Sequence, residues 1–329
     1  MAKATVGRAP KSNGRVAPRR AAVVFKSSEA SKAEKIVLPR GIATVDAFRM
    51  IARSVLRHVV GNEAAVRVAN PDGVHQMRIG LRRLRAAIAT FGELLQDAET
   101  ERLKRELKWL TGRLGPARDL HLLELRIKRQ RTADRAEWLA EIAARRSRAF
   151  AGAKAAMQSA RYRALLHDIR HWIEAGPWAE RPTLRPAHRE AVDFAADVVA
   201  RRARKVMRKA ERLHDLNVEQ RHRLRISAKK LYYAIGFFET LFEGRKARDR
   251  LGTFQSTLKE LLDRLGALND IAVQQRLAIS VAAPNGKRPH GAATQLPPPP
   301  PRDRIKIDHL LQSAVATGAE LATAKRFWD

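Results

Sequence analysis

The chain has 329 residues, with 65 lysines and arginines against 34 aspartates and glutamates, which gives a formal net charge of +31. This excess indicates a polyanionic partner such as nucleic acid, an anionic membrane or another phosphate polymer. The absence of cysteine excludes disulfides and thiolate metal sites, and no apolar run approaches the roughly 18 residues of a membrane span. We therefore expect a soluble, cytoplasmic protein.

The amino-terminal residues 1–35 are rich in lysine, arginine, alanine and serine, and their only acidic residues are Glu29 and Glu34. This composition predicts a disordered basic tail, which could bind nucleic acid on its own. The folded domain is then expected to cover residues 36–329.

Beyond Ile36 the sequence is rich in alanine, leucine, arginine and glutamate, and it predicts an all-α protein. A turn at residues 114–116, Leu-Gly-Pro, is expected to separate two antiparallel helices. Residues 284–303 contain a run of prolines and predict a mobile loop of polyproline character. The expected helices are 43–60, 74–95, 99–113, 117–174 with one break, 187–213, 219–242, 248–264, 269–282 and 304–327.

Several segments of the first half recur about 150 residues later, which indicates an internal duplication. The halves would cover about 36–178 and 179–329. We therefore expect two four-helix bundles related by pseudo-twofold symmetry, with a basic groove or pore between them. The matched pairs are 75–91 with 222–238, 52–57 with 203–208, 107–119 with 258–270 and, more weakly, 170–172 with 326–328.

One helix of each half combines an apolar face with a row of basic residues. On a helical wheel, residues 74–91 place their large apolar side chains in one sector and the basic row beside it, with no acidic residue in the segment. Like charges packed in this way repel each other, so the rows indicate a bound polyanion. The row of the first half is His75, Arg78, Arg82 and Arg85, and the row of the second half is His222, Arg225, Lys229 and Tyr232.

The first helix of each half carries further arginines at helical spacing, namely Arg53 and Arg57 in the first half and Arg204 and Arg208 in the second. All four rows could line a single groove between the bundles. A guanidinium fork suits bidentate contact with phosphate oxygens better than a lysine does. The alternative interpretation is that these rows are only solvated helix faces.

His75 and His222 begin the basic rows. Beside cations the pKa of such a histidine falls, and a bound phosphate would raise it, so binding would take up protons. Asp119 and Asp270 follow the Leu-Gly turn in both halves. The favoured interpretation is that each aspartate stabilises the first turn of the next helix. The alternative is that each one orients a histidine or arginine of the rows.

Other candidate residues carry weaker signals. Arg118 has Asn269 as its counterpart, so a ligand contact of Arg118 would not be duplicated. His167 and His171 have the i, i+4 spacing of a metal-ligand pair, but no third ligand is evident, and a surface pair is the expected interpretation. The sequence offers no phosphate-cradling glycine loop and no Ser-His-Asp arrangement. We therefore expect neither a metal, nor a cofactor, nor catalysis.

Four motifs in order resemble the repeated signatures of the CHAD domain, the conserved histidine α-helical domain. They are NPDGVHQMRIGLRRLRAAIATF, RLGPARD, HRLRISAKKLYYAIGFFE and RLGALND. The resemblance covers about Ile36 to Trp328. It implies two four-helix bundles around a basic central pore, which binds inorganic polyphosphate without hydrolysing it. Bacterial members of this family associate with polyphosphate granules.

By motif position, the resemblance also implies a set of ligand residues, to which the helical wheel adds Arg85. Lysine stands at two of the positions where the family has arginine, which keeps the charge but loses the guanidinium fork. The implied residues are His75, Arg78, Arg82, Arg83, His222, Arg225, Lys229 and Lys230, with Arg53, Arg57, Arg204 and Arg208 from the first helices.

Two functions therefore compete. The first is non-enzymatic binding of polyphosphate, with an affinity that falls steeply as salt rises. The second is a helical nucleic-acid-binding protein that uses the same basic surface and the tail. Single-strand binders interleave aromatic residues for base stacking, whereas aromatic residues are only 5% of this chain and Tyr232 is the only one in the rows. We therefore favour polyphosphate.

Overall fold

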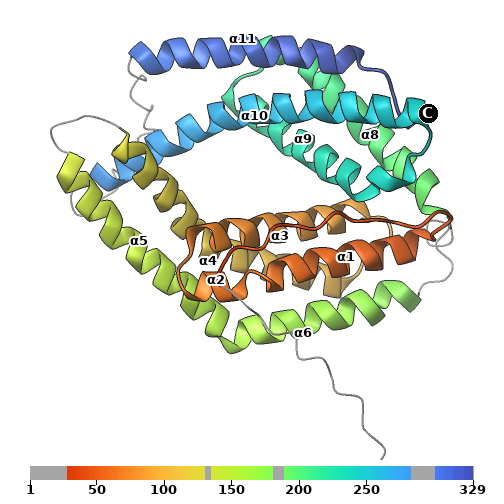
Figure 1. The fold of residues 1–329 in the computed structure, drawn as a ribbon, viewed down its shortest axis with the longest axis horizontal. Helices are drawn as coiled ribbons and strands as arrows, with labels where there is room; N and C mark the ends of the chain where they lie inside the picture. Colours follow the sequence, from red (N-terminus) through yellow and green to blue (C-terminus); the bar gives the residue numbers. More distant parts are fainter. Residues whose placement is uncertain (1–27, 130–134, 181–188, 283–300, 329) are drawn as a thin grey trace, which may run out of the picture.

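The computed structural model describes residues 28–129, 135–180, 189–282 and 301–328, and in these ranges the protein is all-helical, without a named strand (Figure 1). The predicted fold class is thereby confirmed. The first half contains α1 (Thr44–Val60), α2 (Glu63–Arg67), α3 (Pro71–Thr90), α4 (Ala98–Lys128), α5 (Arg135–Gln158) and α6 (Ala160–Ala175). The second half contains α8 (Ala191–Glu211), α9 (Val218–Phe238), α10 (Arg245–Ala282) and α11 (Pro301–Thr323).

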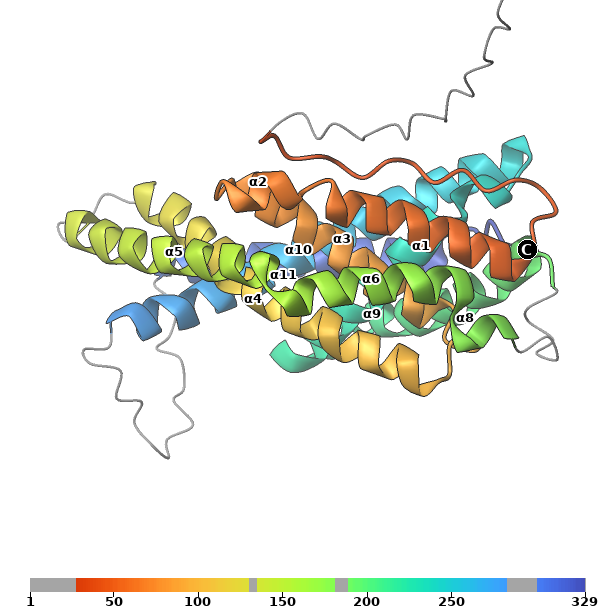
Figure 2. The same ribbon diagram turned by 90° about the horizontal axis from the view of Figure 1, so that it is seen from below.

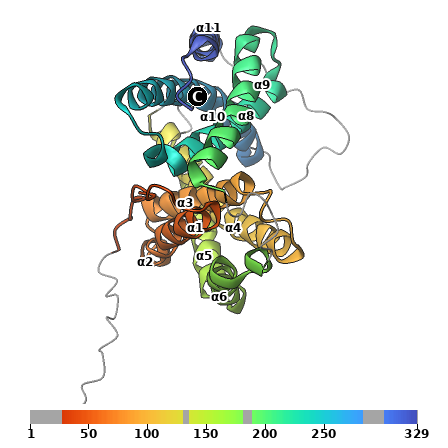
Figure 3. The ribbon, with the colours of Figure 1, turned by 90° about the vertical axis from the view of Figure 1, so that its right-hand side faces the viewer.

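The helices of the two halves gather in two groups that meet along α3 and α9 (Figure 3). Contacts between α1 and α8 and between α4 and α10 complete the junction. The matched segments 75–91 and 222–238 fall on α3 and α9, which have the same place in the order of helices. The order of helices therefore agrees with a duplication, while the pseudo-twofold relation of the two bundles stays a prediction.

The helices α3 and α9 begin at equivalent asparagines. The side-chain oxygen of Asn70 accepts hydrogen bonds from the backbone N–H groups of Asp72 at 2.8 Å and Gly73 at 3.3 Å. Asn217 caps α9 in a reciprocal pair with Gln220. Such caps satisfy the free N–H groups of a helix start. Each helix consequently starts slightly earlier than its apolar pattern predicts, and His75 and His222 lie at equivalent positions of the second turn.

The helices α4 and α10 are continuous, and the breaks predicted within them are wrong. The 31 residues of α4 pass through Pro116, although a proline in a helix interior removes one hydrogen bond and costs about 3 kcal/mol. A row of buried leucines offsets this cost, because α4 packs on α3 and α5 along its length. The break in the stretch 117–174 comes instead after Lys128 and again at Ser159, whose hydroxyl caps α6.

One hydrophobic core serves both halves. The Phe91 ring stacks on Phe194 of the second half at 5.2 Å between ring centroids, and it contacts Phe238, its own repeat equivalent, at 5.6 Å. Arg202 on α8 also crosses the junction, where its guanidinium donates to the carbonyl oxygen of Ala89 at 2.7 Å and to the hydroxyl of Thr90 at 2.9 Å. The halves are therefore parts of one body with a shared core.

An extended strap, residues 28–43, lies along this body and touches both halves (Figure 2). At its start, the Ser31 N–H donates to the Asn62 side chain at 3.0 Å. Further on, Lys35 pairs with Glu239 at 2.8 Å, and the Leu38 N–H donates to Thr240 at 3.0 Å. The predicted disordered tail thus differs from the structure over residues 28–35, where the strap bonds to α1, η3 (Glu239–Leu241) and their neighbours; residues 1–27 lie outside the described residues.

Two further predictions can be placed. Within the described ranges, no helix combines the length and the apolar character that a membrane span requires. The predicted loop 284–303 lies outside the described residues except at its end, where residues 301–303 begin α11.

Candidate anion-binding site

The helix α3 supplies three residues of the first basic row to the junction of the halves. His75, Arg78 and Arg82 follow one another at i, i+3 and i+7, and all three are partly buried. Leu81, Leu84 and their apolar neighbours on α3 are buried in the core. This anchoring holds the row beside α4 and α9, as the amphipathic pattern predicted.

The helix α9 places two residues of the second row against Arg82. Burial lowers the pKa of Arg225, and the nearby charge of Arg82 lowers it further. Burial likewise lowers the pKa of Lys229 to about 8, with additional repulsion from Arg225 and Arg82. Cations that are more than 140 positions apart in the chain therefore meet in one place, with Arg82 between the halves.

The helices α4 and α10 add two aspartates to the same place. The Arg78 guanidinium lies 3.8 Å from the Asp119 carboxylate. Burial raises the pKa of Asp119, Arg78 and Arg118 oppose the shift, and the nearby charge of Asp270 supports it. Asp270 acts in turn on Arg225, whose pKa it raises against burial. These residues form what we call the junction cluster: His75, Arg78, Arg82, Arg118, Asp119, Arg225, Lys229 and Asp270.

The favoured interpretation of the two aspartates is wrong. Asp119 and Asp270 lie inside the continuous helices α4 and α10, so neither is in the first turn of a helix. Asp119 lies beside Arg78, as the alternative interpretation requires, and its role in orienting that arginine stays a prediction. Asp270 is an electrostatic neighbour of Arg225, the repeat equivalent of Arg78.

The repeated Leu-Gly motif has a structural role other than a turn. A Cβ atom at Gly115 would lie 3.0 Å from the Arg78 guanidinium, and one at Gly266 would lie 3.8 Å from that of Arg225. The Arg78 side chain therefore passes over α4 at Gly115, and the Arg225 side chain passes over α10 at Gly266. A side chain at either position would take up space beside the guanidinium, most tightly at Gly115.

His75 is held as a neutral imidazole. Burial lowers its pKa to about 4, and the cations Arg118, Arg82 and Arg78 contribute while Asp72 opposes. The direction agrees with the prediction for a histidine beside cations, but burial contributes more than the cations do. His222 differs, because it is exposed and its Nδ1 lies 2.9 Å from the side-chain oxygen of Asn269, the residue that replaces Arg118 in the second half.

The cluster has an excess of positive charge and unused hydrogen-bond donors. Five cationic side chains stand against two carboxylates. The Nε atoms of Arg82 and Arg225 are buried and have no hydrogen-bond partner in the described part of the chain. Buried donors in native proteins are normally satisfied. An anion with several oxygens would meet both needs, since it supplies acceptors and negative charge together.

The structure does not bring all predicted ligand residues into this cluster. The Arg83 guanidinium stands 5.9 Å from the centroid of the Phe237 ring on α9, outside the cluster, and it adds to the effect of burial in lowering the pKa of His58. Arg85 and Lys230 are exposed, and no described residue pairs with their side chains.

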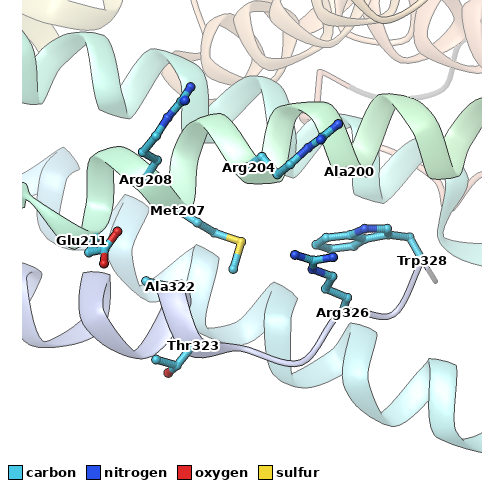
Figure 4. Close-up of a pocket in the computed structure, with 9 residues that line it drawn as sticks. All are labelled: Ala200, Arg204, Met207, Arg208, Glu211, Ala322, Thr323, Arg326 and Trp328. Carbon is cyan, nitrogen blue, oxygen red and sulfur yellow. The ribbon is translucent and has the colours of Figure 1, made fainter.

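The arginines of the first helices lie elsewhere. Arg53 pairs with Glu174 of α6, with 2.7 Å between Nε and Oε1, and Arg57 is exposed. Arg204 and Arg208 line a groove between α8 and α11 (Figure 4). Of the four rows that were predicted to line one central groove or pore, only those of α3 and α9 therefore lie together. That they line a closed pore stays a prediction.

Sequence reasoning left two residues out of the ligand set. Arg118 acts on His75, Arg78 and Asp119, and Asn269 binds His222. Both residues stand directly before the repeated aspartates, a position that could have marked them as part of the site. Because one is an arginine and the other an asparagine, the comparison of the two halves did not identify them. Among the described residues no group of three potential metal ligands occurs; exposed His167 lies 3.5 Å from Asp168.

The fold and the cluster define an all-helical protein with two related basic helices at an internal junction. The chain belongs to the CHAD family, whose domain model matches residues 50–278. The structure is similar to the crystal structure of the CHAD domain from the plant Ricinus communis, with 25% identity, a TM-score of 0.69, and coverage of 89% of this chain and 92% of that one.

A second similar structure is PptA from Streptomyces chartreusis, with 17% identity, a TM-score of 0.53, and coverage of 86% of this chain and 96% of that one. At this identity the likeness shows the fold alone. No curated protein sequence matches the chain.

Proposed function

We propose that the protein binds inorganic polyphosphate at the junction cluster and does not hydrolyse it. The observation that carries the proposal is the meeting of Arg78 and Arg82 from α3 with Arg225 and Lys229 from α9, under burial and without enough carboxylates to neutralise them. Such a site disfavours its own charges until an anion arrives. Membership of the CHAD family supports the same ligand.

A linear phosphate polymer fits the arrangement better than a compact anion. The cations form two rows on two helices, so successive phosphates of one chain could contact Arg78, Arg82 and Arg225 in turn. Guanidinium groups bind phosphate oxygens with charge-assisted hydrogen bonds, which are stronger than neutral ones. Condensed counterions would leave the polymer on binding, so the affinity falls steeply with salt.

The residues of the cluster support binding rather than catalysis. His75, with a pKa of about 4, is a poor general acid near neutral pH. The Asp119 carboxylate faces Arg78. We further propose that the protein resides in the cytoplasm on polyphosphate granules, because the granule polymer offers many phosphates to each protein molecule.

The test is a titration of the protein with long-chain polyphosphate and with single- and double-stranded DNA, at matched phosphate concentration and at two salt concentrations. The test variant is Arg78→Glu with Arg225→Glu. The control is Arg57→Glu with Arg208→Glu, which makes the same charge change at exposed repeat-related positions outside the cluster.

We expect polyphosphate to bind more tightly than DNA at the higher salt concentration. We also expect the cluster variant to lose polyphosphate binding by about hundredfold or more, since each reversed charge removes charge-assisted bonds worth about 1.5–3 kcal/mol. Equal losses in the two variants, or equal affinity for DNA, would show that the protein is a general polyanion binder and would reject the proposal.

A further inference from the structure

The second half contains a groove that the junction cluster does not use. The groove lies between α8 and the segment from α11 to the carboxyl-terminal residues (Figure 4), and it has a volume of about 530 Å³. This volume falls within the range of small-molecule sites, about 300–1,000 Å³. Its chemically distinctive lining residues are Arg204, Met207, Arg208, Glu211, Arg326 and Trp328.

The lining combines an apolar surface with positive charge. Figure 4 shows Met207 and Arg326 reaching into the space between α8 and the carboxyl-terminal segment, with Trp328 at one end. The Trp328 ring is fixed from behind, because it packs edge-on against Phe254 at 5.3 Å and Phe327 at 4.8 Å between centroids. Trp328 is itself largely buried, with 9% of its surface exposed, so the groove offers the exposed part of a rigid aromatic ring and a flexible thioether, which together suit a flat organic ring.

The positive charge of the groove is not neutralised on the α8 side. Arg204 and Arg208 are one helical turn apart, exposed, and without a hydrogen bond or ion pair to any residue in the described ranges. Both residues line the groove, but Figure 4 shows their side chains projecting from α8 on the side away from Met207 and Arg326. To hold one anion at the rim, both guanidinium groups must turn toward the groove.

The first half provides an internal comparison. Arg53 is the repeat equivalent of Arg204, and it is engaged by Glu174 on α6. Trp172, the equivalent of Trp328, is fully buried and donates to Thr100 at 3.1 Å. Arg53 is thus neutralised and Trp172 is enclosed in the first half, whereas in the second half Arg204 and Arg208 have no ion pair among the described residues and line a groove.

We propose that this groove binds a nucleotide, with the base against Met207 and Trp328 and the phosphates on Arg204 and Arg208. The carboxylate of Glu211 faces the same groove and provides an acceptor for a ribose hydroxyl or a base amino group. A bare phosphate polymer would leave the apolar wall unused and would meet the charge of Glu211, so the groove favours a phosphorylated organic ring. The site is separate from the junction cluster and does not depend on polyphosphate binding.

The test is isothermal titration of the full chain with ATP, tripolyphosphate and adenosine. Arg204→Gln with Arg208→Gln is the test variant, and Arg53→Gln with Arg57→Gln is the matched control at the equivalent positions of the first half. In the Arg78→Glu, Arg225→Glu variant, which lacks a working junction cluster, we expect ATP to bind more tightly than tripolyphosphate or adenosine. The test variant should weaken ATP binding by about tenfold or more, and the control should leave it unchanged.

Two more variants separate the base from the phosphates and this groove from the junction cluster. Trp328→Phe should weaken the binding of ATP without changing that of tripolyphosphate. Arg78→Glu with Arg225→Glu should leave ATP binding in place while it removes polyphosphate binding. The proposal is overturned if, in the Arg78→Glu, Arg225→Glu variant, ATP binds no more tightly than tripolyphosphate, or if the Arg204→Gln, Arg208→Gln variant and its control weaken ATP binding equally.

Discussion

The two halves of the junction cluster share a sequence pattern but differ in chemistry. In the first half, His75 is partly buried beside Arg118 and has a pKa of about 4. In the second half, His222 is exposed and hydrogen-bonded to Asn269. The first half therefore contributes three guanidinium groups and a neutral imidazole, while the second contributes one guanidinium group, an amide and a titratable lysine. The two matched segments thus share their helix caps and their aspartates and differ in the surroundings of their histidines.

The largest expected effect comes from Arg82, the α3 residue that lies beside the cations of α9. Arg82→Glu should lower the affinity for polyphosphate by about hundredfold or more, because it reverses a charge next to Arg225 and Lys229. Arg85→Glu makes the same change on an exposed turn of the same helix and should cost only a fewfold loss. Filter-binding titrations measure both, with Arg82→Gln as a milder variant. Equal losses from the two reversals would mean that only total charge matters.

The exchange of Arg118 for Asn269 can be reversed. Arg118→Asn should weaken polyphosphate binding by about tenfold, because the cluster loses one cation. The pKa of His75 should rise from about 4, since one of the charges that lower it is gone. Proton NMR titration of the imidazole measures this second effect. Asn269→Arg should instead strengthen binding. A variant Arg118→Asn with an unchanged His75 pKa would contradict the position assigned to Arg118.

The two glycines of the repeated Leu-Gly motif should respond unequally. Gly115→Ala introduces a Cβ only 3.0 Å from the Arg78 guanidinium and should move that side chain, which costs a fewfold loss in polyphosphate affinity. Gly266→Ala meets Arg225 at an ordinary contact distance of 3.8 Å. It should leave binding unchanged and raise stability by up to about 1 kcal/mol, the helix preference for alanine over glycine. Titration and thermal unfolding of both variants measure these effects, and identical behaviour would rule out the close approach at Gly115.

The smallest effect concerns pH. Lys229 has a pKa of about 8 in the free protein, so it loses its proton as the pH rises through this value. A bound anion favours the protonated form, and polyphosphate affinity should therefore fall between pH 7 and pH 9 by a fewfold. Lys229→Arg keeps the charge and should flatten this part of the pH profile.

The stability of the free protein should change in the opposite direction. The folded-state pKa of Lys229 lies below the value of about 10.4 for an unfolded chain. Between these two values the unfolded chain holds more protons, so the unfolding free energy should rise with pH from about 8 upward. Chemical denaturation at several pH values measures this trend. If Lys229→Arg shows the same pH dependence as wild type, another group is responsible.

Much of the fold could be predicted from local patterns. The apolar spacing and the repeated segments located α1, α3, α8 and α9 within a few residues. The predicted breaks at 114–116 and near Gly266 failed for a tertiary reason. Glycine and proline usually end helices, but here the leucines of α4 are buried along the whole helix, and the glycines are needed where arginines cross.

The site was only partly predictable. A helical wheel identifies which residues share a face, and it grouped His75, Arg78 and Arg82 correctly. It cannot identify which helix packs against that face. Arg53 and Arg204 satisfied the same pattern, yet α1 and α8 turn them toward α6 and α11. Arg118 enters the cluster through the continuity of α4, which the sequence pattern concealed.

The central claim is that both halves hold one bound polymer. The most direct measurement is isothermal titration with a short polyphosphate of defined length, on wild type, Arg78→Gln, Arg225→Gln and the double variant. One binding site per protein is expected, each single variant should weaken that same site without changing the stoichiometry, and the double variant should lose it. Two sites in wild type, with one lost in each single variant, would contradict the claim and show that each half binds phosphate alone.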